Sequence, residues 1–193
     1  MGIIGQAVVL FAVTNIDDIV ILALFFARGA GRPHLVRDIA VGQYLGFAGI
    51  LAVAVAAAFG ARLLPGAVLP WLGLLPLALG LRAGWQVWRS RHDEDGGDGG
   101  GGVEWAGVLG LAAVTFANGG DNIGVYVPVF AAAGAAGMSG YVVVFLLLVA
   151  VWVALGRFFA TRPVVARALS RWGHVLLPVV LVGLGLLILS GGF

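Results

Sequence analysis

The feature that most constrains the fold of this chain is a series of long stretches without charged side chains. Residues 39–61 and 63–81 form two of them, and the stretch 105–156 is interrupted only by Asp121. A helix that crosses a bilayer needs about 20 predominantly apolar residues. With 61% hydrophobic residues and a mean hydropathy of +1.07, a chain of 193 residues cannot hide this much apolar surface in a soluble core. The chain is therefore predicted to cross a membrane several times.

We expect an all-α membrane protein with six transmembrane helices, because the backbone polar groups of a spanning segment must be satisfied within that segment. The expected spans are residues 3–27, 39–61, 68–88, 105–131, 140–160 and 173–191. The first span is not interpreted as a signal peptide, because no basic residue precedes Arg28 and two acids interrupt its apolar run.

Basic side chains alternate between the expected connections. All eleven are Arg: three flank the first connection, three the third and four the fifth, against one in the second and none in the fourth. The positive-inside rule therefore places the odd-numbered connections in the cytoplasm and both termini outside. Because the positions of the arginines are explained by membrane topology, we do not expect nucleic-acid binding. The absence of cysteine excludes disulfide scaffolds and thiolate metal sites.

Two short motifs each occur twice. Residues 12–19 read AVTNIDDI and residues 113–123 read AVTFANGGDNI, and each motif is followed by a Leu-Leu-Pro triplet, ending at Pro76 and at Pro178. The proline follows the motif's Asp by 59 positions (counted from the first Asp of the pair) in the first case and 57 in the second. This agreement predicts a repeat of three helices plus three. Because each repeat contains an odd number of helices, the two repeats start on opposite sides of the membrane and are therefore inverted. Inverted repeats are common in transporters, where the substrate site lies near the midplane of the bilayer.

We treat residues 1–193 as a single transmembrane transporter domain. Its first repeat covers residues 1–88 and its second covers 103–193. Residues 89–102, rich in glycine and acids, form the expected flexible linker.

Carboxylates inside an apolar span are the strongest functional indication in the sequence. A charge near the bilayer centre costs a few kcal/mol, so such residues mark functional sites by default. The candidate metal ligands, all from the two motifs, are Asp17, Asp18, Asp121, Asn15, Asn118 and Asn122. The candidate supporting residues are Thr14, Thr115, Gln43, Gly119 and Gly120, where the two glycines are expected to weaken the helix and free carbonyl groups.

Such an oxygen-rich set suits a hard divalent cation. Three neighbouring carboxylates cannot all ionise cheaply, so at least one should carry a proton when no cation is bound, and cation binding should release it. Two simpler interpretations stay open: the acids could be protonated packing groups, and Gln43 could serve only to bond helices together. Gly42, Gly46 and Gly49 have the spacing of a close helix contact.

Three segments of the chain carry a resemblance to a known family. Residues 11–18 (FAVTNIDD), 42–47 (GQYLGF) and 115–123 (TFANGGDNI) resemble the bacterial cadmium-resistance transporter (CadD-like) family of the lysine-exporter superfamily. This resemblance implies a small six-span efflux protein of the bacterial inner membrane, with Cd²⁺ as its substrate. The metal ion is then cargo, protons are the expected coupling ion, and no permanently bound cofactor is expected.

Several alternatives remain at this point. An all-oxygen site has no obvious preference for Cd²⁺, so Mn²⁺ or Zn²⁺ is an open alternative, as is a homo-oligomer in the lipid bilayer. The runner-up functions are an exporter of basic amino acids and a non-transporting membrane scaffold or metal sensor. An enzyme is disfavoured, because the sequence offers no nucleophile–base pair.

Overall fold

The computed structural model describes residues 2–61, 63 and 107–162, together with scattered positions within 71–85 and 179–190. Pro76, Pro178 and the linker at 89–102 lie outside the described residues, as do most of the third and sixth expected spans. The plan of two inverted three-helix repeats therefore stays a prediction.

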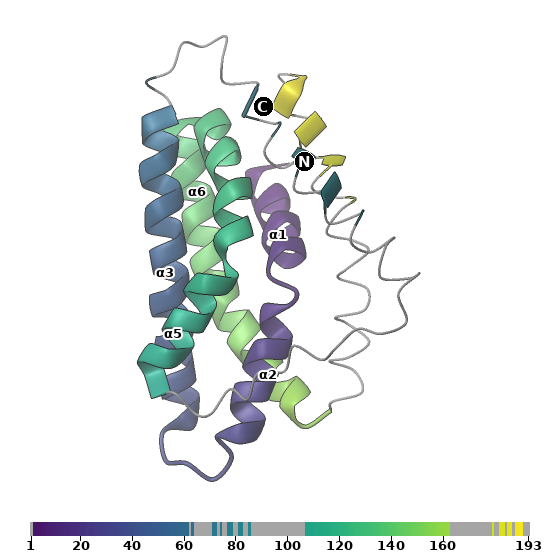
Figure 1. Cartoon of the computed structure of the whole chain (residues 1–193). Helices are drawn as coiled ribbons and strands as arrows, with labels where there is room; N and C mark the ends of the chain where they lie inside the picture. Colours follow the sequence, from purple (N-terminus) through teal and green to yellow (C-terminus); the bar gives the residue numbers. More distant parts are fainter. Residues whose placement is uncertain are drawn as a thin grey trace.

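The described part of the chain is helical and contains no strand. Its helices are α1 (Ile3–Thr14), α2 (Asp18–Arg28), α3 (Leu35–Ala61), α5 (Gly107–Asn118) and α6 (Gly120–Ala160), arranged as a bundle (Figure 1). By length and composition α3 and α6 are able to cross a membrane, and α1 and α2, counted together as one broken segment, are a third candidate span. The prediction of an all-helical membrane protein is confirmed to this extent.

The first expected span is broken, which corrects the prediction of one continuous helix over residues 3–27. Its halves α1 and α2 meet at an angle of 60°. Hydrogen bonds local to the break explain it: the Thr14 hydroxyl donates to the carbonyl of Leu10 at 2.9 Å, and the Asn15 amide donates to the carbonyl of Phe11 at 2.9 Å. Thr and Asn side chains that bond the backbone in this way compete with helix propagation.

Helix α6 consists of two helical segments that meet at Gly134, whose φ of 75° and ψ of 176° are not helical. The chain ascends through α5 and the first segment and returns through the second (Figure 1). Ring contacts confirm this antiparallel arrangement: Tyr126 lies 4.8 Å from Phe145, and Phe130 lies 6.0 Å from Tyr141, between centroids. Helices therefore cover the residues expected for the fourth and fifth spans and continue into the expected connection between them, while two separate membrane crossings in this region stay a prediction.

Helix α3 packs closely against α5 through its glycines. A Cβ atom on Gly46 would lie 2.6 Å from the carbonyl oxygen of Ala112, and one on Gly42 would lie 2.8 Å from that of Val108. A Cβ atom on Gly49 would lie 3.0 Å from the ring of Phe116. The expected small-residue contact is confirmed, and it brings the middle of α3 against the second motif.

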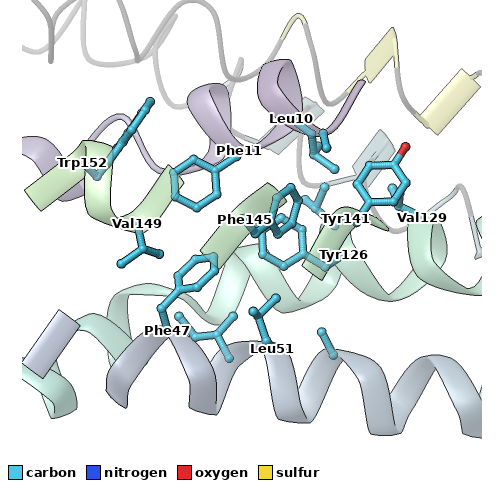
Figure 2. Packing of buried hydrophobic residues seen from close by; sticks show 14 of the residues in the cluster. Leu10, Phe11, Phe47, Leu51, Tyr126, Val129, Tyr141, Phe145, Val149 and Trp152 are labelled. Atoms are coloured by element: carbon cyan, nitrogen blue, oxygen red, sulfur yellow. The ribbon is translucent and has the colours of Figure 1, made fainter. Parts of the chain in front are cut away.

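An aromatic core joins α1, α3 and α6. The rings of Phe11 and Phe47 lie 5.3 Å apart, and Trp152 meets Phe11 edge-on at 5.0 Å. Figure 2 shows these rings, with Tyr126 and Phe145, filling the space between the three helices. Edge-on and tilted aromatic pairs stabilise beyond their buried area, so this core holds the broken first span against α6.

Candidate functional site

Asp17 and Asp18, the two acids at the break between α1 and α2, have different environments. Asp18, in the first turn of α2, is only 4% exposed, whereas Asp17 immediately before the helix is exposed. A carboxylate in the first turn of a helix interacts favourably with the helix dipole. The sequence alone left open which of the two is the direct metal ligand; in the structure Asp18 is the buried one.

Asn118, the last residue of α5, links both acids of the first motif to the second motif. Its amide nitrogen donates to Oδ1 of Asp18 at 2.9 Å and to Oδ2 of Asp17 at 3.1 Å. One donor nitrogen therefore lies between two carboxylates. The structure thus brings together residues that lie about a hundred positions apart in the sequence.

Gln43 of α3 extends this group. Its amide nitrogen donates to Oδ2 of Asp18 at 3.1 Å, and its amide oxygen accepts a hydrogen bond from the Thr115 hydroxyl at 2.7 Å. Both side chains are buried. The expectation that Gln43 bonds between helices is confirmed, and the bond reaches the buried acid itself.

A second polar group surrounds Asn15, which is fully buried. Its amide nitrogen donates to the hydroxyl of Tyr126 at 2.8 Å and to that of Thr14 at 2.9 Å, and these two hydroxyls lie 2.9 Å apart. Its amide oxygen accepts a hydrogen bond from the Asn122 amide at 3.1 Å. Asn15, Thr14 and Asn122 are therefore also brought together across the two motifs.

The carbonyl oxygen of the Asn122 side chain is buried and has no hydrogen-bond partner. It is the one such side-chain atom that the described ranges contain, and Asn122 as a whole is only 2% exposed. Native structures pair nearly all buried polar atoms, and a buried acceptor without a donor costs about 1–3 kcal/mol. This oxygen is therefore available to a cation.

Asp121 is placed less centrally than the sequence suggested. It is exposed, and its Oδ1 accepts a hydrogen bond from the backbone N–H of Asn122 at 2.9 Å. Within residues 2–61 and 107–162, no group of three or more His, Asp or Glu side chains is arranged to hold a metal ion. The structure thus joins Asp17 and Asp18 through Asn118 and leaves Asp121 at the edge.

The two glycines of the second motif differ in role. Gly119 separates α5 from α6 and is buried against Ile50, so that a larger residue would collide with α3. The carbonyl of Gly119 accepts the N–H of Ile123 at 3.2 Å, so this carbonyl is not freed as expected. A Cβ atom on Gly120 would meet nothing within 4 Å.

The segments that carry these side chains contain no basic residue that would neutralise the buried acid. Residues 3–27, 39–61 and 107–156 include neither Arg nor Lys. Burying an ionised carboxylate without a positive partner is costly. These segments therefore provide no positively charged partner for the Asp18 carboxyl group.

Sequence reasoning missed two residues of this region. Tyr126 lies one helical turn after Asn122, and Trp152 donates from its indole N–H to the backbone carbonyl of Asn15 at 2.6 Å. The position of Tyr126 on the same helical face as Asn122 was a usable signal. Trp152 lies more than a hundred positions from the break that it stabilises, and its role depends on the fold.

Comparison with known proteins decides the family. The model of the family described as cadmium resistance transporter matches residues 11–192. The chain belongs to the cadmium resistance transporter family. No match was found among curated proteins or among solved structures. The family match covers both motifs of this transporter, and its apolar helices agree with a place in the lipid bilayer.

Proposed function

We propose that this transporter exports a divalent metal cation in exchange for protons, through a site formed where the two motifs meet. The observation that carries the proposal is the amide nitrogen of Asn118, which donates to both Asp17 and Asp18. Two carboxylates that converge on one positively polarised group present the geometry that a cation requires. A cation that enters there replaces the amide nitrogen.

The ligands available for such a cation are oxygens. Asp18 and Asp17 supply carboxylates, and the amides of Asn118 and Gln43 supply carbonyl oxygens once they rotate away from their present donor orientation. Asp121, which is exposed and accepts a hydrogen bond from the backbone N–H of Asn122, is proposed as a further carboxylate ligand. Carboxylate and amide oxygens favour hard divalent ions, so Mn²⁺ is a candidate cargo besides the Cd²⁺ of the family name and Zn²⁺.

Proton exchange follows from the buried acid and from the energetics of export. Moving a divalent ion out of a cell against an inside-negative potential costs about 2.3 kcal/mol per charge per 100 mV. No nucleotide-binding motif is present in the sequence to supply this energy. Two protons per ion make the cycle electroneutral. We place the protein in the bacterial inner membrane with both termini outside the cytoplasm, as the distribution of arginines indicates.

The test is transport by purified protein in liposomes. Uptake of Cd²⁺, Mn²⁺ and Zn²⁺ is measured with and without an imposed proton gradient, alongside the pH inside the vesicles. We expect gradient-dependent uptake of at least one metal with opposite proton movement. Asp18→Asn should abolish it, because the neutral amide lacks the negative charge that attracts the cation and has no proton to exchange.

Asp38→Asn is the matched control. Asp38 also lies in the first turn of a helix, α3, but outside the uncharged stretch and away from the motifs. It should transport like the wild type. Equal flux in Asp18→Asn and Asp38→Asn would refute the site. Inhibition by Lys or Arg without metal flux would instead support an exporter of basic amino acids, and metal binding without any flux would support a scaffold or sensor.

A further inference from the structure

The hydrogen bonds around Asn15 run in one direction, which fixes the orientation of each group. The Thr14 hydroxyl has one hydrogen, and it donates this to the backbone carbonyl of Leu10 at 2.9 Å. Toward Tyr126 it therefore acts as an acceptor, so the Tyr126 hydroxyl is the donor in their 2.9 Å contact. The Tyr126 oxygen is then free to accept from the amide nitrogen of Asn15 at 2.8 Å.

The Asn15 amide has only one orientation that fits these neighbours. Its nitrogen faces the carbonyl of Phe11 at 2.9 Å as well as the Tyr126 oxygen. A rotation by 180° would direct the Asn15 oxygen at the Phe11 carbonyl, where two acceptors would repel each other. The Asn15 oxygen therefore points to the opposite side, toward α6.

The orientation of Asn15 determines that of Asn122. The Asn15 oxygen needs a donor, and the Asn122 amide nitrogen supplies it at 3.1 Å. The Asn122 oxygen is consequently turned the other way, into a buried position where it has no partner. An isolated Asn122 would be free to rotate and present either its nitrogen or its oxygen.

We propose that Tyr126 and Asn15 are positioning residues that hold Asn122 with its side-chain oxygen presented to the transported cation. This inference rests on the proposed function, and it assigns the three residues unequal tasks. Asn122 contributes the ligand, whereas Asn15, although it belongs to the first motif, contributes orientation. Tyr126 completes the arrangement from α6. A partnerless amide oxygen is a suitable ligand for a hard cation and repels none of its charge.

The test is binding of Cd²⁺ alone, and separately of Mn²⁺, to the full-length protein in nanodiscs by calorimetry. Tyr126→Phe keeps the ring contacts with Phe130 and Phe145 and removes only the hydroxyl. We expect it to weaken metal binding by roughly two- to tenfold, the range that corresponds to one net hydrogen bond. Asn122→Leu removes the ligand oxygen and should weaken binding at least as much.

The decisive measurement is a double-mutant cycle. If Tyr126 acts through Asn122, then Tyr126→Phe has no further effect on binding in the Asn122→Leu background. Two effects that multiply would overturn the inference, as would wild-type affinity in Tyr126→Phe. Asn122→Ala serves in the same cycle should Asn122→Leu fail to insert.

Tyr141→Phe is the matched control for the loss of a buried phenol. Tyr141 lies in the same helix and donates to the side-chain oxygen of Gln6 at 2.9 Å, away from both motifs. Both tyrosine variants should lose similar thermal stability, but only Tyr126→Phe should lose metal affinity. Equal losses of affinity in the two would make the effect structural and refute the positioning role. A wild-type protein that binds no metal would refute the proposed function itself, which is a separate outcome.

Discussion

Gly46→Ala tests whether the close contact of α3 and α5 holds the candidate site together. A Cβ atom at this position would lie 2.6 Å from both the Ala112 carbonyl oxygen and the Thr115 Cβ, where ordinary contacts begin at about 3.4 Å. The two helices would have to separate by roughly 0.8 Å at this point. Gly60 of the same helix is the matched control, because a Cβ atom there meets nothing within 4 Å.

The expected magnitude follows from two opposing terms. Replacing glycine by alanine inside a helix stabilises it by up to about 1 kcal/mol, and both variants receive this term. Overpacking a close contact costs about 1–3 kcal/mol, and only Gly46→Ala carries this cost. The free energy of unfolding of Gly46→Ala should therefore lie about 1–3 kcal/mol below that of Gly60→Ala.

The same displacement reaches the site through Thr115. Its hydroxyl lies 2.7 Å from the Gln43 oxygen, and a shift of roughly 0.8 Å would extend this distance beyond a hydrogen bond. Denaturant titration of the two variants in the same detergent measures the stability difference, and metal uptake into liposomes measures the effect on the site. If Gly46→Ala is as stable as Gly60→Ala and transports at its rate, the close contact does not position the site.

Three further predictions concern single contacts. Trp152→Phe removes the 2.6 Å hydrogen bond to the Asn15 carbonyl and should lower the free energy of unfolding by at least about 0.5–1.5 kcal/mol, which denaturant titration checks. Gly134→Ala places a side chain at a φ of 75° and should cost about 1–2 kcal/mol in the same assay; no loss would mean that the turn is not strained. Thr115→Val removes the donor to the buried Gln43 oxygen and should lower the free energy of unfolding by about 1–3 kcal/mol in the same assay, whereas Thr115→Ser should be as stable as the wild type.

The sequence predicted the helical membrane character from local hydrophobic patterns, and it predicted the meeting of the two motifs from their repetition. Uncharged stretches in the sequence indicate α3 and α6 directly. The Asp and Asn residues that recur in the two motifs indicate a shared functional site. The break between α1 and α2 was not predicted. It results from hydrogen bonds that the side chains of Thr14 and Asn15 make to the backbone. A hydropathy pattern does not show such hydrogen bonds.

The unequal burial of the acids was also beyond the sequence. Asp17, Asp18 and Asp121 are the same residue type in similar motifs. The sequence therefore predicted that all three carboxylates contribute to one cation site. The structure buries Asp18 alone, because Gln43 and Asn118 offer it amide donors in the interior while Asp17 and Asp121 remain exposed. Burial here depends on which partners the fold supplies, and these partners come from α3 and α5.

The amide donors at Asp18 also bear on how the proposed exchange of metal for protons completes its cycle. A carrier must close around its site twice in each cycle, once with its cargo and once when it returns without it. A buried carboxylate that has no partner would oppose this closure. Asn118 and Gln43 donate hydrogen bonds to Asp18 from two helices other than its own. Because these donors sit on uncharged amides, the proposed site lets a divalent ion displace them without competing against a fixed positive charge. Replacing Asn118 or Gln43 by a basic residue should therefore favour the closed state and exclude the metal.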